Sequence, residues 1–155
     1  MMEKKAYVGF KLLNNAEKMS KSDYCIRVGR PLGEGEDMHE KGYLVEYEDG
    51  YRSWSPAEVF NEAYRSIHKG MDFSMALYCA KRGWAIARAG WNGKDQFVYH
   101  VPSQHVATKT DVAVKAFGPE VYIGDYLSIK TSENTVNTWV PSVSDLFAND
   151  WFVID

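Results

Sequence analysis

Apolar and polar residues alternate in short runs along this chain, and glycine, proline, asparagine and aspartate separate the runs. A period of two residues is typical of a half-buried strand, and a period near 3.6 is typical of a helix. In the first part of the chain, this pattern predicts strands over residues 7–12, 43–47 and 51–54, helices over 19–27 and 56–64, and a loop over 29–41. The intervening Asp49-Gly50 is a strong hairpin signal.

Capping residues mark the starts of these two helices. Ser20 or Ser22 can accept a hydrogen bond from a free backbone N–H at the start of the first helix. Ser55 and Glu58 have the spacing of a capping box, with Pro56 at the first helical position. We therefore expect the second helix to begin at the proline.

The pattern is clearer after a joint near residues 68–70. There we expect strands over 84–88, 96–101, 126–130, 136–140 and 151–154 and helices over 75–82 and 111–117. Asp72 or Ser74 can cap the first helix, and Ser142 and Asp145 have capping-box spacing before a helix of one or two turns. Antiparallel hairpins with short helices set apart predict an α+β fold of two small modules, residues 1–69 and 70–155.

Composition narrows the possible functions. The net charge is −3, whereas a protein that binds duplex nucleic acid usually carries a basic face. No apolar run approaches the ~18–20 residues that span a bilayer, and the N-terminus lacks the apolar region of a signal peptide. Cys25 and Cys79 are isolated, which favours a reducing cytoplasm over a disulfide framework.

Motifs for catalysis or cofactor binding are missing from the sequence. It contains no P-loop, no Gly-x-Ser-x-Gly, and no complete Gly-x-Gly-x-x-Gly fingerprint. The spacing of its four histidines fits no zinc pattern. We expect no cofactor, no metal and no catalytic residue.

Two blocks of the second module carry a family resemblance. The first is MDFSMALYCAKRGWAIARAGWNGK, in which a helix with Asp-Phe near its start leads to Arg and then Gly-Trp-Asn-Gly-Lys. The second is YLSIKTSENTVNTWVPSVSDLFANDWFVI, with Lys-Thr, Trp-x-Pro-Ser, an Asp in a short helix and Asp-Trp before the last strand. In this order, the blocks resemble the Thoeris anti-defence 2 family of phage proteins. The resemblance covers Met71 to Asp155.

The resemblance implies a function. Members of this family counter the bacterial Thoeris system, which makes a cyclic ADP-ribose-type signal from NAD. They bind that signal and hold it unchanged, as tetramers with pockets between subunits. The expectation is a non-enzymatic phage protein of the host cytoplasm that sequesters a cyclic nucleotide as a homo-oligomer. The short form of the family lacks residues 1–69, so the resemblance assigns no role to the first module.

A cyclic ADP-ribose isomer has a planar purine, two riboses and a pyrophosphate, so its binder needs flat aromatic surfaces and polar partners. Phe73, Trp91 and Trp139 lie at the ends of predicted elements and are the candidates for stacking on the base. Burial in the core is the alternative for all three. Trp84 and Trp151 lie within predicted strands, and we expect both to be core residues.

The predicted turn after residue 88 offers polar groups. The Asn92 side chain both donates and accepts, Gly93 allows close approach to the backbone, and Lys94 supplies a charge for phosphate. The simpler interpretation is a type I′ hairpin turn, for which Asn-Gly is typical.

Arg88, Ser142 and Asp145 complete the candidate ligand-binding set. Arg88 can reach a phosphate or remain a solvated charge on a strand face. Ser142 and Asp145 lie near a helix N-terminus, which can bind an anion, but a formed capping box would occupy both. Asp145 or Asp150 can alternatively accept hydrogen bonds from ribose hydroxyls.

Three other functions remain open at this point. The same aromatic and polar groups suit a cyclic dinucleotide. Asp145 and Asp150 form a carboxylate pair that a nucleotide-cleaving enzyme could use. A phage structural or protein-interaction module would have no affinity for nucleotides.

Overall fold

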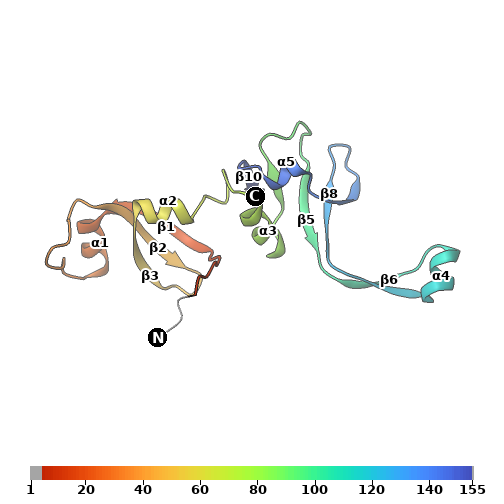
Figure 1. Ribbon diagram of the computed structural model, residues 1–155, viewed down its shortest axis with the longest axis horizontal. Coiled ribbons are helices and arrows are strands. Elements are labelled where there is room, and N and C mark those ends of the chain that lie inside the picture. The colour runs from red at the N-terminus through yellow and green to blue at the C-terminus, as the bar shows by residue number, and fades with distance from the viewer. Residues whose placement is uncertain (1–4, 155) are drawn as a thin grey trace. The chain divides into compact units, whose positions relative to one another are not determined.

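The computed structural model describes residues 5–154, and the chain forms two compact units, an N-terminal unit (residues 1–64) and a C-terminal unit (residues 65–155) (Figure 1). Every strand pairing among the described residues is antiparallel, and short helices lie outside the sheets. The predicted α+β fold is confirmed. Within residues 5–154, no helix combines the length and apolar character that crossing a membrane requires.

The N-terminal unit is a three-stranded sheet with a helix on each face. Its strands lie in the order β1-β2-β3, and the elements are β1 (Leu13–Ser20), α1 (Lys21–Val28), β2 (Lys41–Tyr47), β3 (Arg52–Pro56) and α2 (Ala57–Ala63). Side chains of β2 alternate between the two faces, as the period of a strand requires. Leu44 packs with Tyr24 of α1, whereas the Tyr43 ring stacks on Phe60 of α2 at 3.9 Å.

Two predictions for this unit are wrong. Residues 7–12 are not a strand, because the pairing of β1 with β2 ends at Leu13 opposite Tyr47, and no described strand lies opposite the earlier residues. The side chain of Val8 is 95% exposed. Alternation alone does not make a strand when no partner strand supplies hydrogen bonds.

The second error concerns the start of α2. Pro56 is the N-cap residue and Ser55 belongs to β3, so the capping box expected from Ser55 and Glu58 does not form. The start of α1 also differs, because Met19 and Ser20 belong to β1. Ser20 caps this helix by accepting from the Asp23 backbone N–H, as one of the two predicted caps.

Gly42 in β2 occupies a position where a side chain does not fit. A Cβ atom there would overlap the Trp54 ring and the backbone oxygen of Ser55. Gly42→Ala is therefore expected to destabilise the N-terminal unit by about 1–3 kcal/mol through overpacking. Hydrogen exchange over residues 41–56 should become faster. Gly9→Ala is the control, since its Cβ would have nothing within 4 Å, and equal exchange in both variants would contradict the prediction.

The C-terminal unit contains a five-stranded sheet in the order β10-β4-β5-β8-β9. Its strands are β4 (Ile86–Arg88), β5 (Phe97–Val101), β8 (Tyr126–Lys130), β9 (Val136–Trp139) and β10 (Trp151–Val153), and its helices are α3 (Phe73–Lys81), α4 (Asp111–Phe117) and α5 (Val143–Leu146). These elements agree with the predicted ones to within a few residues. Trp84 precedes β4 rather than lying in it, and it is partly buried against the core.

A strand pair that the apolar pattern did not predict extends this unit. β6 (Gln104–Ala107) pairs with β7 (Glu120–Ile123), and α4 connects them. Figure 1 shows this pair continuing from the ends of β5 and β8, away from the rest of the C-terminal unit. We call β6, α4 and β7 the arm. Its separation from the unit's core leaves its side chains open to solvent.

Candidate functional site

Three aromatic residues from distant parts of the C-terminal unit pack around Trp151. The ring centroid of Trp151 lies 5.4 Å from Phe73, 5.3 Å from Trp91 and 6.1 Å from Trp139. Trp151 is completely buried, as expected, and the other three are partly buried. Phe73 begins α3, Trp91 follows β4, and Trp139 ends β9, so the fold gathers all three predicted stacking residues. We call these four residues the aromatic cluster.

The Asp145 carboxylate lies beside this cluster and accepts four hydrogen bonds. Its Oδ1 accepts from Arg88 Nη1 at 2.9 Å and from the Trp91 indole Nε1 at 3.1 Å. Its Oδ2 accepts from the Ser142 backbone N–H at 2.9 Å and from the Ser142 hydroxyl at 2.7 Å. The backbone carbonyl of Asp145 accepts from the Trp151 indole at 3.0 Å. Asp145 therefore holds two rings of the aromatic cluster through two different groups.

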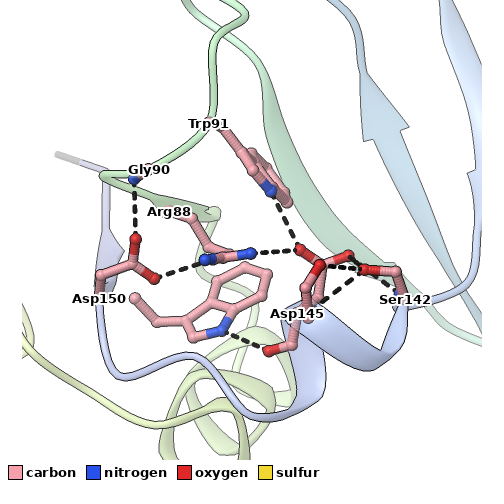
Figure 2. A network of polar contacts seen from close by, with 8 residues as sticks. Arg88, Gly90, Trp91, Ser142, Asp145 and Asp150 are labelled. Atoms are coloured by element: carbon pink, nitrogen blue, oxygen red, sulfur yellow. Dashed lines mark hydrogen bonds and ion pairs between the residues drawn. The ribbon is translucent and has the colours of Figure 1, made fainter.

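Arg88 connects Asp145 to a second carboxylate (Figure 2). Arg88 Nε donates to Asp150 Oδ1 at 2.8 Å, and the other Asp150 oxygen accepts from the Gly90 backbone N–H at 2.8 Å. The pairing of Arg88 with Trp151 across β4 and β10 brings Asp150 next to the guanidinium. We call Arg88, Asp145 and Asp150 the ionic network.

The structure shows what Arg88, Ser142 and Asp145 contact within the protein. The capping box of Ser142 and Asp145 is present, as predicted from its spacing. Arg88 is not a solvated charge on a strand face, because its side chain is only 17% exposed and forms two ion pairs. A buried guanidinium requires such partners, since burial without them would cost several kcal/mol.

The type I′ turn expected at Asn92-Gly93 is wrong. That turn needs a positive φ at both residues, whereas the non-glycine residue with positive φ in this connection is Asp95, at 55°. The connection is an eight-residue loop, 89–96, between β4 and β5. Hydrogen bonds at its start, from Gly90 to Asp150 and from Trp91 to the Arg88 carbonyl, direct the chain away from a two-residue turn.

Asn92, Gly93 and Lys94 lie on this loop and outside the ionic network. Asn92 and Lys94 are exposed, and neither side chain makes a hydrogen bond within residues 5–154. A Cβ at Gly93 would meet the far end of the Gln96 side chain, which can move aside. The structure thus brings six of the nine predicted residues together and leaves these three beside them on the loop.

A surface hollow of about 310 Å³ adjoins the cluster. It is lined by Asp72, Phe73 and Ser74 at the start of α3 and by residues 146–149 after α5. Sites for small molecules usually enclose ~300–1,000 Å³. The volume of this hollow is at the lower end of that range. Phe73 is the member of the aromatic cluster that lines it.

Electrostatics at Asp145 favour the charged form. Burial acts to raise the pKa of Asp145, but hydrogen bonds from Ser142, Arg88 and Trp91 outweigh it and lower the pKa from 3.8 to about 2. The hydrogen bond from Arg88 is the main reason that the pKa of Asp150 is also lowered. Both carboxylates are therefore ionised at neutral pH, and neither has the raised pKa of a general acid.

This shift predicts a pH dependence of stability. Because the pKa of Asp145 is lower in the folded unit than in the unfolded chain, its contribution is complete above about pH 4. It is lost as the pH falls toward about 2, and amounts to about 2 kcal/mol. Thermal unfolding of the C-terminal unit across this range measures the loss. The Asp145→Asn variant should show a shallower dependence, and an identical slope in both proteins would contradict the assignment.

The charged groups of the ionic network bind one another and the Gly90 backbone N–H. Among the described residues, no group of three or more His, Cys, Asp or Glu is placed to hold a metal ion. The roles of Trp151 and Gly90 as hydrogen-bond donors to the two aspartates were not predicted. A lone arginine in the otherwise apolar strand Ile86-Ala87-Arg88 was the available signal that a carboxylate must lie nearby.

The fold and the site define a small α+β domain in which an aromatic cluster lies beside an ionic network. The family model of the Thoeris anti-defense 2-like domain matches residues 71–154. The chain belongs to this family, as its sequence motifs suggested. A relative named Thoeris anti-defense 2, from Bacillus phage SP01, is 34% identical over 84 residues, which are 54% of this chain and 94% of the relative.

Proposed function

We propose that this protein is a phage anti-defence protein whose C-terminal unit binds a cyclic ADP-ribose-type nucleotide signal and holds it without degrading it. The observation that carries the proposal is the gathering of Phe73, Trp91 and Trp139 around Trp151. Family membership supports the anti-defence role. The proposed setting is the cytoplasm of the infected host, where such a signal is made.

The chemistry of the site suits this ligand class. A purine ring can stack on a partly buried indole, with a contribution of about 1–3 kcal/mol for each base. Lys94 and Asn92, on the exposed loop beside Trp91, are the donors proposed for the pyrophosphate. Tight binding could therefore combine stacking with charged hydrogen bonds from a neighbouring loop.

Sequestration is favoured over cleavage by the state of the two aspartates. A general base needs a free lone pair within reach of the proton that it abstracts. All four acceptor positions of the Asp145 carboxylate are in use, and both Asp150 oxygens accept bonds from Arg88 and Gly90. Asp145 is therefore a poor general base, and Asp150 would have to act without it.

We further propose that the protein acts as a homo-oligomer, with the arm as a contact surface. The arm exposes several large apolar side chains: Val112 at 80%, Val114 at 48%, Phe117 at 63%, Tyr122 at 60% and Ile123 at 39%. We propose that these side chains form an apolar contact surface, as exposed apolar patches often do. The small size of the hollow also fits a site that a second subunit completes.

Charged residues on the arm should disrupt this assembly. Phe117→Lys with Tyr122→Lys is expected to reduce the mass in light scattering from a multiple of 17.7 kDa to that of one chain. Desolvating two lysines in an apolar interface costs several kcal/mol. Val59→Lys is the control, because Val59 is 57% exposed in the N-terminal unit. An unchanged mass in the arm variant would remove the arm from the interface.

The function is tested by capture and release. The purified full chain is incubated with the cyclic ADP-ribose-type signal made by a Thoeris system, filtered, and then heated. Recovery of intact signal only after heating supports sequestration. Passage of unchanged signal through the filter overturns the proposed ligand, and parallel samples with cyclic dinucleotides then test that class. Recovery of a chemically altered product overturns the non-enzymatic assignment.

A further inference from the structure

The proposed site contains a carboxylate, that of Asp145, with no acceptor position left for a ligand. We propose that Asp145 and Arg88 are positioning residues that fix the orientation of the Trp91 indole, and that they do not contact the nucleotide. This inference rests on the proposed function, because Trp91 is the ring proposed to stack on the base. It also changes the role that the sequence suggested for two of the nine candidate residues.

Asp145 carries the first part of this inference. It is 7% exposed, and each of its two carboxylate oxygens accepts two hydrogen bonds from protein donors. An ionised carboxylate has about four lone-pair positions in total. A ribose hydroxyl could bind Asp145 only by displacing Arg88, Trp91 or Ser142, and each displacement would leave a donor without its partner.

Arg88 uses two of its five N–H donors on the two carboxylates. Its Nη1 donates to Asp145 and its Nε donates to Asp150, so two edges of the planar guanidinium face carboxylates. The three charges of the ionic network sum to one negative charge. A pyrophosphate would be repelled by this sum, which places the phosphates toward the exposed Lys94.

The bond from Trp91 to Asp145 determines how the ring lies. The rotation of an indole about its second side-chain torsion has broad energy wells, so packing alone allows a range of orientations. A hydrogen bond at Nε1 selects one of them, with interplanar angles of 76° to Trp151 and 69° to Trp139. Figure 2 shows the indole nitrogen of Trp91 directed at the same carboxylate that receives Arg88.

The residues of the ionic network lie on or next to three different elements of the C-terminal unit. Arg88 lies on β4, Asp145 on α5, and Asp150 immediately before β10. The loop that carries Trp91 is attached to the last of these by the Gly90 backbone N–H. The orientation of the Trp91 ring therefore depends on the relative positions of β4, α5 and β10. A preorganised binding surface needs side chains that are fixed in this way.

The first test uses the free protein and needs no ligand. In the full chain, the indole N–H resonance of Trp91 is assigned by its disappearance in Trp91→Phe. Arg88→Lys keeps the positive charge but cannot bridge both carboxylates. This variant should shift or broaden the Trp91 resonance and leave that of Trp84 in place. Arg82→Lys, in the same unit, is the matched control. An unshifted Trp91 resonance in Arg88→Lys would overturn the positioning role.

The second test separates positioning from direct contact. With the enzymatically made cyclic ADP-ribose-type signal as the probe, Arg88→Lys should weaken binding about tenfold in the wild-type background. In a Trp91→Phe background, which lacks the indole donor, the same substitution should have no further effect. Equal losses in both backgrounds would show that Arg88 acts on the ligand directly and would overturn the proposal. Failure of the wild-type chain to bind would reject the proposed function, and the resonance would still decide the positioning role.

Discussion

Trp91→Ala is expected to weaken retention of the cyclic ADP-ribose-type signal by about 5- to 150-fold. This range corresponds to the loss of one stacking interaction of about 1–3 kcal/mol. The loss should be large because Trp91 is the ring proposed to stack on the base. It is partly buried, it lies in the loop after β4, and its nitrogen donates to Asp145. Isothermal titration of the full chain measures the effect.

The control for this experiment is another tryptophan of the same unit. Trp84 also packs partly buried against the hydrophobic core, but it is not a member of the aromatic cluster. Trp84→Ala should therefore lower the stability of the unit while changing affinity little in protein that is still folded. Similar losses of affinity in the two variants would mean that Trp91 acts only through folding.

Local signals were sufficient to predict most of the C-terminal unit. Capping residues act within one helical turn, and alternation acts within one strand, so neither requires knowledge of distant contacts. The caps at Asp72 and Ser142 are both formed, and α4 ends at Gly118 as the sequence indicated. Each of these features depends on residues that are neighbours in the sequence.

Predictions that depended on distant partners were less successful. Residues 7–12 alternate as well as β1 does, but it is β1 that lies opposite β2. The two strands of the arm were missed because they expose most of their side chains to solvent and therefore lack a strong apolar period. Pairing in both cases is decided by the register with another strand, which a single segment does not contain.

In the candidate site, too, the residues could be predicted from local signals, whereas their contacts could not. The composition of the site was predictable, since six of its residues were named from their types and their places at element ends. Their relations were not, because Arg88 is separated from Asp145 and Asp150 by 57 and 62 residues. The Asn92-Gly93 signal failed for the same reason, as contacts from Gly90 to Asp150 overrode a local turn preference.

Asp145→Ala is expected to destabilise the C-terminal unit by about 3 kcal/mol. Removing one partner from a buried ion pair costs ~3–5 kcal/mol, and the bond that Arg88 keeps with Asp150 places the value at the lower end. The variant also removes the carboxylate that accepts from Ser142 and Trp91, so the start of α5 loses its capping box. For a unit of this size, the melting temperature should fall by roughly 10–25 °C.

Tryptophan fluorescence measures this change selectively, because four of the five tryptophans lie in the C-terminal unit. Asp125→Ala is the control, since Asp125 is an exposed carboxylate paired with His100 at the end of β5. Exposed pairs contribute little to stability, so this variant should melt close to the wild type. A comparable melting temperature for Asp145→Ala and Asp125→Ala would mean that the ionic network does not stabilise the unit. The aromatic cluster would then owe its geometry to ring packing alone.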